Sequence, residues 1–225
     1  MTVLLIHAGV CDSRQWARQL ALLPQAIAPD LRGFGDTPEP DGEFSMVDDV
    51  AALLDGPAAV VGNSLGGRVA LQLALARPDL VERLLLVAPG LPGHAWSAEV
   101  RACGDAEDEA VERGDLDAAI EVSVDFWAKP HVRDIIRPMQ RRALELQVGA
   151  SAHERPGPPL EPGAVRCPTL IAVGEDDVRD FHEIGTRLAA EIPNARLVTI
   201  PGAGHLPNLE TPEAFDLLLL EFLED

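Results

Sequence analysis

A serine flanked by glycines is the residue whose surroundings point most directly to chemistry. Ser64 stands in Gly62-Asn63-Ser64-Leu65-Gly66, a G-x-S-x-G spacing that follows an apolar run and precedes a helical pattern. Glycines suit this place because the backbone of a tight strand-to-helix turn passes close to adjacent segments. The hydroxyl becomes a nucleophile only if a base takes its proton and a third group orients that base. A glycine-rich turn can also be merely a turn, so the rest of the chain must supply these partners.

His205 is the preferred base among the six histidines. It follows the last predicted strand, whereas His7 lies in a loop expected to serve the oxyanion and is interpreted as structural. His94, at the entrance to a helical insertion, is the reserve candidate. Surface positions are expected for the remaining three, which are His131, His153 and His182.

Asp177 is the preferred acid partner of that base. It stands three residues after Gly174, far enough round the turn after a strand to project back over the sheet edge. Asp180 is the second choice, because it suits the N-cap of the next helix, where a carboxylate accepts from a free backbone N–H. Asp176 and Glu175 are interpreted as solvated turn residues.

Two backbone N–H groups are expected to bind a developing oxyanion. One belongs to Leu65, which follows the nucleophile and gains from the dipole of the helix that it begins. The other comes from the loop after the first strand, where Gly9 is the expected donor and Val10 is its near neighbour.

Strands and helices alternate along most of the chain, and this order decides where the polar residues meet. Apolar runs predict strands at 3–6, 26–29, 58–61, 84–88, 169–173 and 196–200. Helical patterns predict helices at 13–23, 45–54, 68–76, 181–191 and 212–225. Repeated βα units imply a doubly wound, mainly parallel sheet with right-handed crossovers. The carboxyl ends of its strands share one edge, so His7, Ser64, Asp177 and His205 are expected there.

One insertion interrupts the alternation. Residues 94–153 lack strand signals and predict three helices, one beginning at Ser97 and the others at 116–127 and 132–148. Residues 154–168 are rich in proline and are interpreted as a return linker. We therefore expect a core of residues 1–93 and 154–225 and a helical cap of residues 94–153.

Composition excludes several functions. The formal net charge is −19, from 37 acidic and 18 basic residues, which disfavours nucleic acid and anionic membrane surfaces as partners. The single lysine, Lys129, makes lysine-based nucleophilic chemistry improbable. Cys11, Cys103 and Cys167 are widely spaced without a zinc pattern, so reduced thiols and no metal are expected. No apolar run approaches the length of a membrane span, and a cytoplasmic location is expected.

These motifs together resemble the α/β-hydrolase superfamily, and in particular its compact bacterial carboxylesterase-like members. The resembling segments are His7-Ala8-Gly9 with Trp16, and 30–35, 62–67, 174–177 and 204–205. The resemblance implies a triad of Ser64, Asp177 and His205, an oxyanion hole at Gly9 and Leu65, and a helical cap.

The sequence departs from the family pattern in three places. Ala8 replaces the usual glycine after His7, and Asn63 precedes the nucleophile. The family's first two strands have no counterpart, so a six-stranded sheet is expected.

The resemblance implies a serine esterase that cleaves a small carboxylic ester through an acyl-enzyme, with no cofactor and a small-molecule acyl substrate. A thioesterase, lactonase or C–C bond hydrolase would use the same triad, and a non-catalytic receptor could share the scaffold. The substrate pocket is expected between sheet edge and cap, with Val10, Trp96, Phe126 and Trp127 as candidate walls. The sequence does not indicate an oligomeric state.

Overall fold

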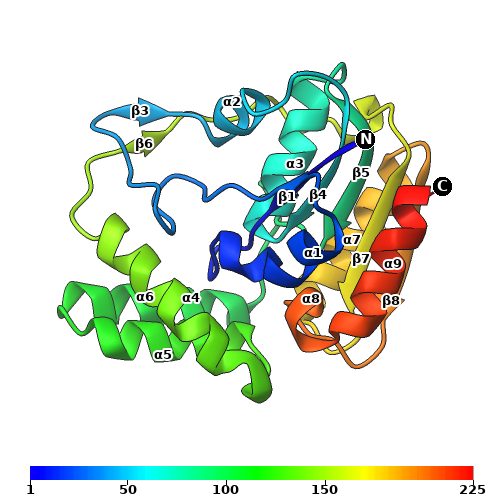
Figure 1. Cartoon of the computed structure of the whole chain (residues 1–225). Helices are drawn as coiled ribbons and strands as arrows, with labels where there is room; N and C mark the ends of the chain where they lie inside the picture. The colour runs from blue at the N-terminus through cyan, green and yellow to red at the C-terminus, as the bar shows by residue number, and fades with distance from the viewer. Residues whose placement is uncertain (225) are drawn as a thin grey trace.

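The structure is a computed structural model that describes residues 1–224 (Figure 1). Its central sheet has six parallel strands. The final position of the predicted C-terminal helix, residue 225, lies outside the described residues. The strands lie in the order β2 (Ala26–Ile27), β1 (Thr2–Ile6), β4 (Ala58–Asn63), β5 (Val81–Val87), β7 (Thr169–Gly174) and β8 (Ala195–Ile200). Every neighbouring pair is parallel. The predicted six-stranded sheet is therefore confirmed, and it is parallel throughout.

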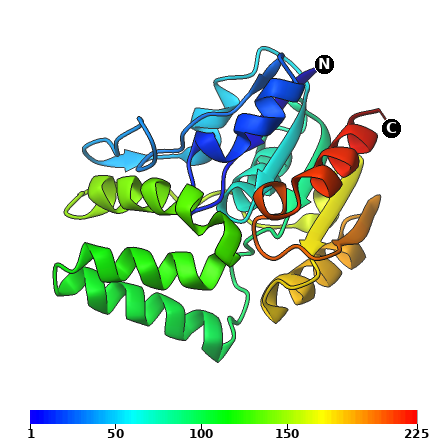
Figure 2. The same cartoon turned by 60° about the horizontal axis from the view of Figure 1, so that its bottom comes forward.

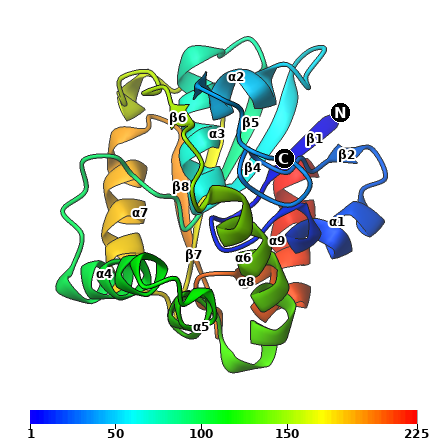
Figure 3. The same ribbon diagram turned by 90° about the vertical axis from the view of Figure 1, so that its left-hand side faces the viewer.

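Helices cover both faces of this sheet, as Figure 3 shows nearly edge-on. One face carries α2 (Met46–Ala51), α3 (Leu65–Ala76) and α7 (Arg179–Glu191), and the other carries α1 (Ala17–Leu22) and α9 (Pro212–Glu224). Side chains alternate between the two faces along a strand. In β1, Leu4 and Ile6 join the first apolar cluster, while Val3 and Leu5 join the second. This two-sided burial is why the strands are continuous apolar runs in the sequence.

The insertion forms a cap of three helices beside the carboxyl edge of the sheet. These are α4 (Ala98–Glu112), α5 (Leu116–Trp127) and α6 (Arg133–Gln147), which lie side by side in green in Figure 2. The side chains of Ser97 and Asp115 accept from backbone N–H groups in the first turns of α4 and α5, respectively. The apolar interior of the cap is shared with Ala8, Val10 and Leu206 of the core. The cap therefore packs on the loops where the catalytic residues were predicted.

Several short elements had no sequence signal. The helix α8 (Pro207–Glu210) follows the His205 loop, and β3 (Glu43–Phe44) pairs in parallel with β6 (His153–Glu154). Short 3-10 helices also occupy Pro130–Val132 and Pro162–Ala164, whereas the one at Ser13–Trp16 is the first part of the helix predicted at 13–23 and leads into α1. Segments of two to four residues are too short for a periodic pattern to show. In the described part of the chain, no helix has both the length and the apolar character needed to cross a bilayer.

Candidate active site

Ser64 occupies a strained turn between β4 and α3. Its backbone has φ 54° and ψ −109°, in the region of positive φ that residues with a side chain rarely adopt. The N–H of Ser64 donates to the Val87 carbonyl at 2.9 Å, and its own carbonyl accepts from Arg68 and Gly90 at 3.0 Å each. Such conformations cost of order 1–3 kcal/mol and persist where the surroundings hold them. The turn therefore fixes where the Ser64 hydroxyl lies.

The glycines around Ser64 are required by contact with the backbone. A Cβ on Gly62 would lie 2.1 Å from the Gly66 carbonyl oxygen, and a Cβ on Gly66 would lie 2.2 Å from that of Ile6. Both distances are far below a van der Waals contact. The G-x-S-x-G spacing thus reflects the close approach of three backbone segments.

His205 and Asp177 form a buried pair. Their Nδ1 and Oδ2 atoms are 3.1 Å apart, and the side chains are 5% and 1% exposed. In the neutral ring, a proton on Nδ1 donates to the carboxylate, and Nε2 is then free to accept a proton. A Cβ on Gly174 would lie 2.1 Å from the Gly204 carbonyl oxygen, so glycine there allows the two loops to meet.

Two aromatic rings lie against the His205 imidazole. The Trp127 and Phe181 ring centroids are 4.7 and 4.4 Å from it. Packing of this kind restricts the rotation of the imidazole. Phe181 was not among the predicted site residues, because a helical period shows that it is buried but not what it faces.

The reserve base and the second-choice acid pair with each other. His94 Nε2 is 3.0 Å from Asp180 Oδ1, which also accepts from the Ser97 N–H at 2.7 Å. Burial would raise the pKa of Asp180, but the hydrogen bonds from Ser97 and His94 outweigh it and lower that pKa. The N-cap of α7 is Val178, so Asp180 is not the helix cap that the sequence suggested. This pair joins the start of the cap to α7.

The predicted oxyanion donors lie next to each other. A Cβ on Gly9 would be 3.7 Å from Leu65 Cβ, an ordinary van der Waals contact. Within the described residues, the N–H groups of Gly9, Val10 and Leu65 have no acceptor in the protein, whereas the Ala8 N–H donates to Gln15. These three N–H groups therefore carry no internal hydrogen bond in this part of the chain, and Gly9, Val10 and Ser64 border one cavity.

A network of buried amides connects the loops of the site. Gln15 Oε1 accepts from the Ala8 N–H at 2.8 Å, and its Nε2 donates to Asn63 Oδ1 at 2.7 Å and to Asn208 Oδ1 at 3.0 Å. Asn63 Nδ2 donates in turn to the His205 carbonyl at 3.2 Å. Gln15, Asn63 and Asn208 are 1%, 0% and 2% exposed. The sequence marks Asn63 by its place before Ser64, but it contains no signal for Gln15 or Asn208.

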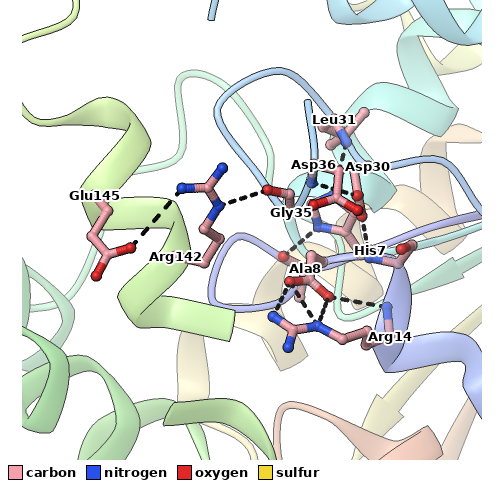
Figure 4. A network of polar contacts seen from close by, with 11 residues as sticks. His7, Ala8, Arg14, Asp30, Leu31, Gly35, Asp36, Arg142 and Glu145 are labelled. Atoms are coloured by element: carbon pink, nitrogen blue, oxygen red, sulfur yellow. Dashed lines mark hydrogen bonds and ion pairs between the residues drawn. The ribbon is translucent and has the colours of Figure 1, made fainter. Parts of the chain in front are cut away.

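His7 connects the predicted oxyanion loop, residues 7–10, to the segment that follows β2, as Figure 4 shows. Its Nε2 accepts from the Leu31 N–H at 3.0 Å, so the proton sits on Nδ1, which donates to the Ala8 carbonyl at 2.8 Å. Burial lowers the pKa of His7. The neutral ring therefore joins the backbone at Ala8 to the backbone at Leu31 through these two hydrogen bonds.

The turn that follows Leu31 is also held by the cap (Figure 4). Asp30 accepts from the backbone N–H groups of Ser13 and Asp36 at 2.7 and 2.8 Å. Arg142 of α6 donates to the Gly35 carbonyl at 2.9 Å. The turn at residues 30–36 therefore connects cap helix α6 to the loop that contains His7.

The single lysine joins the cap to the loops that carry Asp177 and His205. Lys129 Nζ lies 2.6 Å from both Asp176 Oδ2 and the Gly202 carbonyl. Its backbone N–H donates at 3.1 Å to Glu210, whose carboxylate also accepts from the Gly204 N–H. Asp176 is therefore a partner of the cap rather than only a solvated turn residue.

Two cavities meet at Ser64 and Trp127. The first, of about 270 Å³, is lined by Gly9, Val10, Ser64, Glu107, Trp127, Gln140, Gln147 and His205. The second, of about 380 Å³, is lined by Ser64, Leu65, Arg68, Gly90, Leu91, Pro92, Gly93, Trp96, Val100, Trp127 and Phe181. Of the candidate walls, Val10, Trp96 and Trp127 line these cavities. Phe126 lines neither and packs against Trp127, with centroids 4.6 Å apart.

Residues for metal or thiol chemistry are not gathered at this site. Among residues 1–224, no group of three or more His, Cys, Asp or Glu side chains is placed to hold a metal ion. Cys11 is fully buried beside the oxyanion loop, and burial raises the pKa of its thiol well above the ordinary value. The thiol therefore stays protonated and a poor nucleophile.

Comparison with known proteins identifies the family. Residues 3–216 match the model described as the alpha/beta hydrolase family. The chain belongs to this family.

Relatives within the α/β-hydrolase family have different activities in their names. A Variovorax paradoxus protein named "Putative carbamate hydrolase RutD" is 30% identical to this chain. The alignment covers 97% of this chain and 90% of the relative. The pimeloyl-acyl-carrier protein methyl ester esterase of Chromobacterium violaceum is also 30% identical, over 97% of this chain and 91% of its own. The solved structure of a thermophilic esterase from Thermogutta terrifontis superposes with a TM-score of 0.78 at 29% identity, covering 100% of this chain and 89% of that one.

Proposed function

We propose that this α/β-hydrolase is a serine esterase that cleaves a small carboxylic ester. The observation that carries the proposal is the meeting of three groups at one cavity. Ser64 on its strained turn, His205 held by Asp177, and Gly9 and Val10, whose N–H groups have no acceptor in the described part of the protein, all border the same cavity. This is the set of groups that acyl transfer through a serine requires.

In the proposed reaction, the Ser64 hydroxyl oxygen attacks the ester carbonyl while His205 Nε2 takes its proton. The N–H groups of Gly9 and Leu65 stabilise the oxyanion of the tetrahedral intermediate. His205 then returns the proton to the leaving alcohol oxygen as the C–O bond breaks, and an acyl-enzyme remains. Water, deprotonated by His205, attacks that acyl group, and the carboxylic acid and free Ser64 are released.

We also propose a division of labour between two parts of the chain. The core, residues 1–93 and 154–225, carries the chemistry, and the cap, residues 94–153, closes the substrate cavities. The core supplies Ser64, Asp177 and His205, while the cap supplies Trp96, Trp127 and the polar wall of one cavity.

The named activities of the relatives favour an ester or a carbamate as the substrate. A thioester, a lactone or a 1,3-diketone would meet the same triad. These substrates differ in the leaving group, which the triad does not select.

A substrate panel tests the proposal. We expect p-nitrophenyl acetate and butyrate to be hydrolysed, with oxygen esters giving a higher kcat/KM than matched thioesters, lactones, carbamates and 1,3-diketones. A higher kcat/KM for another class would replace the ester assignment with that class. No turnover of any member, together with no labelling by a fluorophosphonate, would support a non-catalytic receptor instead.

A further inference from the structure

The two cavities at Ser64 differ in chemistry. The 380 Å³ cavity is walled largely by apolar side chains, among them Leu91, Trp96 and Phe181. The 270 Å³ cavity is bordered on its cap side by Glu107, Gln140 and Gln147. We call this 270 Å³ cavity the Glu107 cavity. An ester bound across Ser64 therefore places one half in an apolar space and the other in a polar one.

The polar wall of the Glu107 cavity is a built network. Glu107 accepts from Ser123 through one carboxylate oxygen, and from Gln140 Nε2 at 2.9 Å through the other. Ser123 and Gln140 are 0% and 4% exposed, and burial raises the pKa of Glu107. Gln140 Oε1 is buried without a hydrogen-bond partner. An unpaired buried acceptor is costly, and a ligand that donates to it removes the cost.

The position of His205 decides which half of the substrate faces this wall. His205 must return its proton to the leaving oxygen, so the leaving group lies on the side that His205 borders. His205 lines the Glu107 cavity and does not line the apolar one. The alcohol half of the ester therefore enters the Glu107 cavity, and the acyl half enters the apolar cavity.

We propose that the Glu107 cavity selects esters whose alcohol carries a second hydrogen-bond donor, a hydroxyl or a protonated amine, joined to an apolar acyl group. Glu107 and Gln140 accept from that donor. This inference rests on the proposed esterase function. A carboxylate at this wall also disfavours an anionic alcohol.

Two isosteric pairs of butyrate esters test the proposal. The first pair is 2-hydroxyethyl and propyl butyrate; the second is protonated 2-(dimethylamino)ethyl and 3-methylbutyl butyrate. The kcat/KM values are measured in a pH-stat at pH 7 and divided by the alkaline hydrolysis rate of each ester. We expect the donor-bearing member of each pair to be preferred about tenfold, the value of one hydrogen bond to a charged or buried acceptor.

Variants then assign the preference to the wall. Glu107→Gln is expected to abolish the ammonium preference, and Gln140→Met to reduce the hydroxyl preference at least threefold. Glu109→Gln is the matched control, since it removes a carboxylate from the exposed face of the same helix and is expected to leave both ratios unchanged.

The outcomes separate this inference from the esterase proposal. If the esters are hydrolysed and a fluorophosphonate labels the protein, but the isosteric pairs react equally, the inference is wrong and the esterase proposal stands. A preference that survives in both wall variants also overturns it. If no ester is hydrolysed and no label is incorporated, both fall.

Discussion

The two sides of Ser64 are built in opposite ways. On the core side, buried amides and glycines in backbone contact fix the oxyanion loop, the nucleophile turn and the His205 loop relative to one another. On the cap side, exposed ion pairs such as Arg137 with Glu121 join neighbouring helices, and only Glu107, Gln140 and Gln147 form the polar wall of the cavity. Exposed ion pairs contribute little to stability because water screens them, whereas a broken buried amide leaves unpaired groups that cost more.

This difference indicates which changes the enzyme tolerates. Substitutions on the core side should reduce kcat for every substrate, because they move or remove reacting groups. Substitutions on the cap side should redistribute kcat/KM among substrates. The first three of four predictions on the core side, ordered by expected size, test that rule.

The largest effect is expected for Ser64→Ala. Removal of the nucleophile should lower kcat by about 10⁴-fold or more, since the oxyanion donors alone supply only residual catalysis. Turnover of p-nitrophenyl butyrate measures the loss, and thermal unfolding controls for folding. Activity within tenfold of the wild type would remove Ser64 from its role.

Asp177→Asn is expected to come next, with a loss in kcat of about 10³- to 10⁴-fold, because the amide no longer fixes the His205 tautomer. Asp180→Asn is the matched control, three residues along the chain in the first turn of α7. It disturbs the contacts to His94 and Ser97, so it should affect cap stability and leave kcat within a few fold. A larger kcat loss in Asp180→Asn than in Asp177→Asn would reverse the assignment.

Gln15→Leu should lower kcat by about 10- to 100-fold with little change in KM. The substitution removes the acceptor of the Ala8 N–H and the donor to Asn63, so the oxyanion loop loses its alignment with the nucleophile turn. Gln25→Leu, at an exposed position nearby, is the control. Equal kcat in the two variants would show that the amide network only supports the fold.

The smallest effect concerns pH and His7. Because its pKa is lowered in the folded state, the unfolded chain takes up this proton first as pH falls below the ordinary value of 6.5. The contribution of His7 to the free energy of unfolding therefore falls below pH 6.5, by at most about 1.4 kcal/mol per pH unit, until the pKa of the folded state is reached. Urea unfolding at pH 7, 6 and 5 should show a steeper loss for wild type than for His7→Asn. Parallel losses would contradict this prediction.

The sequence predicts the core side far better than the cap side. Local patterns in the sequence mark the strand ends, the glycine spacing and the order Ser64, Asp177, His205. A parallel sheet then brings these three residues to the same edge. Gln15 and Asn208 leave no such pattern, because their hydrogen bonds cross 193 positions of the chain. In the cap, the helical period identifies buried faces but does not distinguish Trp127, which borders the cavities, from its neighbour Phe126. In the sequence, nothing distinguishes Glu107 from the other acidic residues of α4.

The central claim is that Ser64 is the nucleophile that His205 and Asp177 activate. Incubation of the wild type with a fluorophosphonate, followed by peptide mapping with tandem mass spectrometry, tests it most directly. The account predicts one adduct, on the Ser64 side chain, formed much more slowly in Asp177→Asn and at the wild-type rate in Asp180→Asn. An adduct on another residue, or none under conditions that label a known serine esterase, would contradict it.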